Sequence, residues 1–185
     1  MATTDPTQLF YELVWPHRAL IARAARIQTG NAAEADDLAQ ETLLKAFRSI
    51  GTFRPGTQVR AWLLTILRNT RIDRARTAAS AATFVPLDEA TLEISDSGED
   101  QSASPQDVEQ LLSAFSDAEV IDALQAISED LRWTLLLVDV EGIDHREAAE
   151  IMAIPVGTVK SRVHRGRALL RQALLPLARE RRWVK

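Results

Sequence analysis

Residues 144–175 read DHREAAEIMAIPVGTVKSRVHRGRALLRQALL, and this stretch decides the fold of the chain's second half. Asp144 precedes Glu147 by the spacing of a capping box, which predicts a helix that begins at this point. The Ile154–Pro155 step should end that helix, because a residue before proline avoids the α region while proline suits the first turn of a new helix. We therefore expect two helices joined by a tight turn, the first of them short.

The second of these helices should have two unlike faces. Its apolar and small residues recur at near-helical spacing and should face a core: Val159, Val163, Gly166, Leu170 and Leu174. The rest of its surface is polar and mostly basic, and comprises Lys160, Ser161, Arg162, His164, Arg165, Arg167 and Arg171. A solvated basic face is the alternative. The succession of short helix, tight turn and basic helix instead favours a recognition helix in the major groove of DNA.

The composition predicts an all-α protein with one or two domains. The 185 residues are 46% hydrophobic, include only 7 Gly and 7 Pro, and are rich in helix formers. The absence of Cys excludes disulfides, thiolate metal sites and cysteine nucleophiles. Because there is neither an apolar run of membrane-spanning length nor a signal-like amino terminus, we expect a soluble cytoplasmic protein without membrane insertion.

The net charge of −4 is unevenly distributed along the chain. Residues 1–76 carry a net charge of +4, residues 77–116 carry −8, and residues 117–185 are neutral. Within the last part, residues 156–185 hold 9 basic residues and a single acid. Because salt screens exposed charges over about 8 Å, the acidic middle does not cancel this local positive field. The charge pattern is therefore compatible with DNA as a partner.

The amino-terminal part should contain two helical segments. Residues 7–28 are apolar at helical spacing, with Pro16 as a kink or restart and Gly30 as the end. Asn31, with an acid at capping-box spacing, should open a long helix that ends before Gly51. The buried stripe expected for this helix is Ala35, Ala39, Leu43, Ala46, Phe47 and Ile50.

The outer face of the long helix is acidic with one apolar residue in it. It carries Asp37, Gln40, Glu41 and Leu44, followed by basic residues. Acids in the first turns of a helix can simply complement the helix dipole. The pattern alone leaves open whether this face is a partner site.

Residues 51–59, GTFRPGTQV, predict a loop, and residues 60–76 predict a helix that becomes rich in arginine. We expect its apolar residues to pack: Trp62, Leu63, Ile66 and Leu67. Its outward side carries Arg60, Arg68 and Arg71, with Asn69, Asp73, Arg74 and Arg76 nearby. A loop followed by a basic helix could hold single-stranded nucleic acid. A solvated amphipathic helix is the alternative.

Residues 77–116 contain neither Lys nor Arg and predict a flexible acidic linker. As a coil it would span roughly 35 Å. Beyond it we expect about four helices, with a cap at Ser128 and a stop at Gly142. The basic tail that begins at Pro176 could extend the DNA contact, but we expect it to be solvated.

Three motifs carry a family resemblance. They are DDLAQET at 36–42, FRPGTQVRAWLLTILRNTRID at 53–73 and, beyond the acidic linker, VDVEGIDHREAAEIMAIPVGTVKSRVHRGRALL at 138–170. In this order the chain resembles a bacterial sigma factor of the ECF (extracytoplasmic function) class of the sigma-70 family. The resemblance implies a sigma-2-like domain over 1–76 and a sigma-4-like helix-turn-helix domain over 117–185.

The resemblance also implies a promoter-specificity factor without catalytic residues, cofactor or metal. Its implied partners are core RNA polymerase, promoter DNA and an anti-sigma factor. The implied polymerase-binding residues are Asp36, Asp37, Gln40, Glu41 and Leu44. Those implied to melt and read the minus-10 element are Arg60, Trp62, Arg68, Asn69, Arg71 and Asp73. For the minus-35 element they are Lys160, Ser161, His164 and Arg165 in the major groove, with Arg162 and Arg167 on phosphates.

Two other classes of function deserve comparison. A stand-alone helix-turn-helix regulator would explain the carboxy-terminal half but leaves residues 36–42 and the arginine-rich helix without a role. An enzyme could use Asp36, Asp37, Glu41 and Asp73 as metal ligands. Adjacent aspartates diverge on a helix, however, and no nucleophile–base pair is evident.

Overall fold

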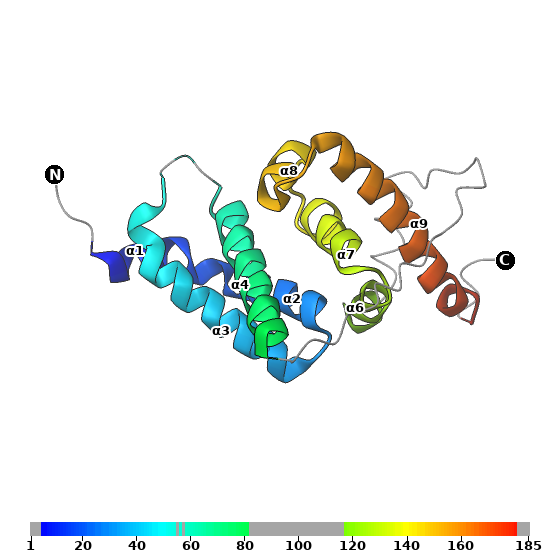
Figure 1. The fold of residues 1–185 in the computed structure, drawn as a ribbon, viewed down its shortest axis with the longest axis horizontal. Helices are drawn as coiled ribbons and strands as arrows, with labels where there is room; N and C mark the ends of the chain where they lie inside the picture. The colour runs from blue at the N-terminus through cyan, green and yellow to red at the C-terminus, as the bar shows by residue number, and fades with distance from the viewer. Residues whose placement is uncertain (1–4, 55, 57, 82–116, 181–185) are drawn as a thin grey trace.

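The computed structural model describes residues 5–54, 56, 58–81 and 117–180. In these ranges the chain forms helices and no strand, so the all-α expectation is confirmed. Two helical bundles lie next to each other (Figure 1). The acidic segment 82–116 and residues 181–185 of the tail lie outside the described residues. The flexibility expected of the linker therefore stays a prediction. No helix in the described ranges is long and apolar enough to cross a membrane.

The first bundle is built from four α-helices and two short 3-10 turns. In order they are α1 (Pro6–Leu13), a turn at Trp15–His17, α2 (Arg18–Thr29), α3 (Ala32–Ser49), a turn at Ile50–Thr52 and α4 (Val59–Ala81). Pro16 lies in the first 3-10 turn, where the chain restarts as expected. Gly30 ends α2 with a φ of 69°, and the Asn31 side chain accepts hydrogen bonds from the backbone amides of Ala33 and Glu34.

The core of the first bundle lies between α2, α3 and α4. Of the expected buried stripe, Ala35, Ala39, Ala46 and Ile50 are buried, whereas Leu43 is half-buried and Phe47 is 40% exposed. The buried face also includes Leu38 and Thr42, both fully buried, because helical periodicity places them in line with Ala35 and Ala46. Phe47 lies at the edge of this buried face, where its ring contacts that of Phe10.

The end of α4 departs from the expected domain boundary. The boundary at residue 76 falls inside the helix, which continues to Ala81. Residues 77–81 read TAASA, and alanine is the best helix former. The hydroxyl of Thr77 also donates to the Asp73 carbonyl, so the residue stays compatible with a helix. The segment expected to be linker from residue 77 is therefore helical through its first turn.

The second bundle contains four α-helices in residues 117–180, as expected. They are α6 (Asp117–Gln125), α7 (Glu129–Leu135), continued by a π-helical turn at Leu136–Val140, α8 (His145–Met152) and α9 (Val156–Glu180). All five α9 residues expected to face the core are buried. Gly166 is required there, because a Cβ would come within 2.9 Å of the Leu135 Cγ atom.

The predicted helix-turn-helix is formed by α8 and α9. The Asp144 side chain accepts hydrogen bonds from the Arg146 and Glu147 amides at 2.8 and 2.9 Å, so the cap is confirmed. Ala153, with a φ of 55°, ends α8 one residue before the Ile154–Pro155 step.

The carboxy-terminal tail was expected to be solvated from Pro176 onward; Pro176, Arg179 and Glu180 are exposed, but part of this segment packs on the bundle. The helix α9 continues through Pro176 to Glu180, and Ala178 is buried. Leu174 and Ala178 lie one turn apart on the same face, so their burial holds this last turn against the bundle.

The two bundles contact each other directly. Helix α4 lies beside α8, and α2 lies beside α6 and α7. The surface of α4 that faces the second bundle includes residues expected to bind DNA.

Candidate DNA and polymerase interfaces

Helix α9 presents a compact polar surface that is available to a partner. The side chains of Lys160, Ser161, His164 and Arg165 are all exposed, while Val159 and Val163 are buried and fix the rotation of the helix. Among the described residues, Lys160, His164 and Arg165 have no ion-pair partner. Helical spacing gathers these side chains on adjoining positions of one face, as the sequence predicted.

Two arginines of α9 are instead engaged within the second bundle. Arg167 Nη2 lies 2.6 Å from Asp139 Oδ1, and the two side chains are only 16% and 8% exposed. Arg162 forms an ion pair with Asp130 of α7. Both pairs attach the recognition helix to the α7 segment, a role that sequence spacing did not indicate. The assignment of Arg162 and Arg167 to phosphates stays a prediction.

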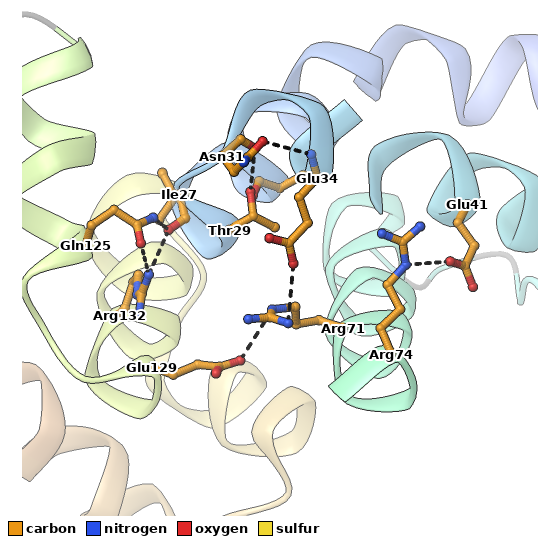
Figure 2. A network of polar contacts seen from close by, with 11 residues as sticks. Ile27, Thr29, Asn31, Glu34, Glu41, Arg71, Arg74, Gln125, Glu129 and Arg132 are labelled. Atoms are coloured by element: carbon orange, nitrogen blue, oxygen red, sulfur yellow. Dashed lines mark hydrogen bonds and ion pairs between the residues drawn. The ribbon is translucent and has the colours of Figure 1, made fainter. Parts of the chain in front are cut away.

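Two of the arginines expected at the minus-10 element lie next to carboxylates. Arg60 Nη2 lies 2.8 Å from the Glu141 carboxylate of the second bundle. Arg71 lies between Glu34 of α3 and Glu129 of α7, at 3.7 and 3.8 Å (Figure 2).

The other residues of the predicted minus-10 set lie on the same helix in varied surroundings. Asp73 accepts a hydrogen bond from Lys45 at 3.2 Å, and Asn69 is exposed. Trp62 is half-buried, and its ring centroid lies 5.3 Å from that of Phe53. Phe53 follows the 3-10 turn at Ile50–Thr52. The Arg68 Nε atom is buried without a hydrogen-bond partner among the described residues. The aromatic pair lies where the 51–58 segment joins α4.

The acidic face of α3 is largely free, with one exception. Asp36, Asp37 and Gln40 are exposed, and Leu44 is 55% exposed. Glu41 is half-buried and accepts a hydrogen bond from Arg74 Nε at 2.7 Å (Figure 2). This hydrogen bond, together with Lys45, holds the pKa of Glu41 below its ordinary value. Glu41 therefore ties α3 to α4.

An aromatic surface on α1 and α3 was not predicted from the sequence. Tyr11, Trp15 and Phe47 are 58%, 42% and 40% exposed, and Phe10 lies between Tyr11 and Phe47 with ring centroids 5.9 and 5.3 Å away. Sequence periodicity offers no signal for such a surface, because apolar residues at helical spacing are interpreted as core.

The carboxylates considered as metal ligands do not gather. Among the described residues, no group of three or more His, Cys, Asp or Glu is placed to hold a metal ion. Glu41 and Asp73 are each bonded to basic side chains instead.

Comparison with known proteins matches both halves of the chain. The model for Sigma-70 region 2 matches residues 13–81, and the model for Sigma-70, region 4 matches residues 117–170. The RNA polymerase sigma-H factor of Pseudomonas aeruginosa is 36% identical over 152 residues, covering 81% of this chain and 78% of that protein. The ECF RNA polymerase sigma factor EcfG of Rhodopseudomonas palustris is 36% identical over 143 residues, covering 77% and 72%.

A solved structure has a similar fold. It is the sigma factor RpoE in complex with the anti-sigma factor NepR from Bartonella quintana, 26% identical, with a TM-score of 0.67 and coverage of 89% of this chain and 96% of that one. The region 2 match also accounts for the part of the chain that a stand-alone regulator left unexplained. With both regions matched in order and relatives aligned across them, the chain belongs to the ECF sigma factors of the sigma-70 family and is a transcription initiation factor.

Proposed function

We propose that this sigma factor binds core RNA polymerase in the cytoplasm and directs it to promoters through two separate readers, without catalysis of its own. Helix α9 reads a minus-35 element, and α4 with its preceding loop reads and helps to open a minus-10 element. The single observation that carries this proposal is the free polar surface of α9, on a helix whose other side is fixed in a core.

On α9, the exposed Lys160, Ser161, His164 and Arg165 are the candidates for contact with base edges. Arginine and lysine donate to guanine acceptors in the major groove, and such contacts discriminate between bases. Arg162 and Arg167 are assigned to phosphates, which give affinity and register. For Arg167 this role competes with its ion pair to Asp139.

On α4, the set comprises Arg60, Trp62, Arg68, Asn69, Arg71 and Asp73. Opening a base pair costs a few kcal/mol and must be offset by stacking and hydrogen bonding of the released base. The Trp62 and Phe53 rings supply apolar surface for stacking beside the basic helix. This combination favours single-stranded DNA over duplex.

On α3, the polymerase-binding face comprises Asp36, Asp37, Gln40, Glu41 and Leu44. An exposed leucine surrounded by acids suits a partner that offers a basic rim around an apolar contact. An anti-sigma factor is a further partner of this chain in our proposal. It is supported by the similar RpoE structure, which was solved with the anti-sigma factor NepR.

The test is transcription by purified core RNA polymerase on fragmented genomic DNA, with and without this chain, followed by mapping of transcript 5′ ends. We expect a set of starts that depends on the chain and shares two upstream sequence elements. Sequence-specific DNA binding without chain-dependent transcripts would contradict the proposal and favour a stand-alone regulator.

A further inference from the structure

The recognition helix α9 is joined to the preceding α7 segment by a buried ion pair of defined geometry. Arg167 Nη2 lies 2.6 Å from Asp139 Oδ1, and Arg167 Nε lies 3.3 and 3.2 Å from the two carboxylate oxygens. The two side chains are 16% and 8% exposed. One edge of the guanidinium therefore meets both oxygens of the carboxylate, and such a two-point contact fixes direction as well as distance.

Asp139 lies in the π-helical turn that extends α7. The five consecutive residues 133–137 are all buried, whereas a helix at a protein surface ordinarily buries a single face. The widened turn at Leu136–Val140 is closed by a hydrogen bond from the Glu141 amide to the Leu136 carbonyl at 2.9 Å. Turns of this kind are rare and are found frequently at functional sites. Here the turn ends with the Asp139 carboxylate against α9.

At its closest point, the contact between α7 and α9 has a side chain from only one of the two helices. Gly166 lies against Leu135, where a Cβ would come within 2.9 Å of the Leu135 Cγ atom. Glycine permits this close approach but offers no side chain that could interlock with the neighbouring helix. The two ion pairs beside this point therefore help to set the angle of α9. The pair with Asp139 is the more buried, since Asp130, which pairs with Arg162, has a side chain that is 63% exposed.

Arg167 lies on the same stripe of α9 as two of the residues proposed to read bases. Lys160, His164 and Arg167 occupy positions i, i+4 and i+7, which share one side of a helix. The ion pair thus holds α9 at a point about 10 Å along its axis from Lys160.

A small rotation of α9 is enough to disturb base contacts. A turn of about 15° moves a side-chain atom that lies about 6 Å from the helix axis by about 1.5 Å. Hydrogen bonds between nitrogen and oxygen span a range of only about 0.5 Å in length. The rotation of α9 therefore decides which base edges its side chains can reach.

We infer that Asp139 is a positioning residue for promoter recognition: by holding Arg167 it sets the rotation of α9, and with it the base edges that the exposed polar surface of this helix meets. The inference rests on the proposed reading of the minus-35 element by α9. It gives a role in specificity to Asp139, which belongs to none of the proposed DNA-binding or polymerase-binding sets. Arg167 then acts through the position of its helix and not through a phosphate.

The test uses holoenzyme assembled from core RNA polymerase and the full chain, on the mapped promoter and on copies that each have one minus-35 base pair replaced. Transcript yield is titrated against holoenzyme concentration, and the ratio of affinities for the natural and the replaced promoter is the preference. Asp139→Asn keeps the shape of the side chain but removes its negative charge. Arg167→Lys keeps the positive charge but removes the planar fork.

We expect a wild-type preference of about tenfold at a contacted base pair, and a fall to about twofold in both variants. A variant that only folds less well loses yield on every promoter alike, so a loss of stability alone leaves the preference unchanged. Asp122→Asn, at an exposed site of α6, and Arg171→Lys, at an exposed site of α9, make the same chemical changes. Both controls should keep the wild-type preference.

A phosphate contact by Arg167 predicts a different result. If Asp139 only competed with a phosphate for Arg167, Asp139→Asn would raise the affinity for every copy of the promoter and leave the preference unchanged. The slope of log affinity against log salt concentration would also become steeper by about one. An unchanged preference in either variant would overturn the inference. A wild-type holoenzyme without preference among the copies would instead remove the proposed minus-35 reader, and the inference with it.

Discussion

Helices α9 and α4 both carry arginines of the proposed DNA-binding sets, but their ion pairs differ: those of α9 stay within its own bundle, whereas two of those of α4 reach the other bundle. On α9, Arg165 is exposed and has no ion-pair partner within the described residues. On α4, Arg60 and Arg71 face carboxylates of the other bundle, and Arg74 is bonded to Glu41. The residues proposed to contact minus-35 base edges are thus exposed, whereas two arginines of the proposed minus-10 set contact carboxylates of the other bundle.

The difference shows that a basic helix cannot be assessed from its sequence alone. An arginine with a carboxylate at hydrogen-bonding distance contributes to packing and is withheld from phosphate until that contact breaks. The two helices have similar arginine content, and only their surroundings separate an available surface from an occupied one. The following changes test that separation.

The largest effect is expected for Arg167→Ala in α9, and it is an effect on the stability of the protein. It leaves Asp139, whose side chain is 8% exposed, without its partner. Breaking such a buried pair costs about 3 kcal/mol, whereas Arg165→Ala at an exposed site should change the free energy of unfolding by no more than about 0.5 kcal/mol. Urea unfolding followed by circular dichroism measures both. Equal stability of the two variants would mean that Arg167 is as available to DNA as Arg165.

Arg165→Ala should instead lower transcription from chain-dependent promoters by about tenfold, because a lost base contact costs 1–3 kcal/mol. Affinity for core polymerase should be unchanged in a pull-down. Arg171→Ala, also exposed on α9 but farther along the helix, is the matched control and should retain most activity. A comparable loss in the control would assign the effect to overall charge.

Asp37→Arg should weaken binding to core polymerase by about fivefold, because it reverses a charge at the rim of the proposed interface. Binding to minus-10 single strands and minus-35 duplex should persist. Asp122→Arg makes the same charge change at an exposed site of α6 and should leave core affinity unaltered. An Asp37→Arg chain that binds core as well as wild type would remove α3 from the interface.

The smallest effect concerns Glu41, whose bond to Arg74 lowers its pKa. A carboxyl group with a lowered pKa in the folded state adds stability above its unfolded pKa, and this stability is lost as pH falls through the folded pKa. Glu41→Gln should therefore lower Tm slightly at neutral pH, and the difference from wild type should shrink as the pH falls below the ordinary pKa of about 4.5 and vanish only below the lowered pKa of the folded state. A Tm difference that stayed constant with pH would contradict the ion-pair role.

Local signals predicted much of the fold. Asp144, Asn31 and Gly30 mark helix ends whose chemistry is confined to a few neighbouring residues, and all three act as expected. The core-facing side of α9 was likewise correct, because burial repeats at the helical period. Phe47 was misplaced because it lies at the edge of its stripe, where period alone does not decide burial.

Contacts between distant residues could not be predicted in the same way. Glu141 is 118 residues from Arg23 and 81 from Arg60, and no spacing rule connects them. Arg167 and Arg165 are equally basic in the sequence, yet only one faces Asp139. The resemblance to sigma factors supplied the candidate sets, and the structure adds which members already have partners.

The most direct test of two separate readers combines a protein variant with promoter variants. Transcription is measured for wild type and Arg165→Ala on one mapped promoter, on the same promoter with its minus-35 element replaced, and with its minus-10 element replaced. We expect replacement of the minus-35 element to reduce wild type to the level of Arg165→Ala without reducing the variant further, while replacement of the minus-10 element reduces both. If Arg165→Ala lost as much as wild type when the minus-35 element was replaced, α9 would not be its reader.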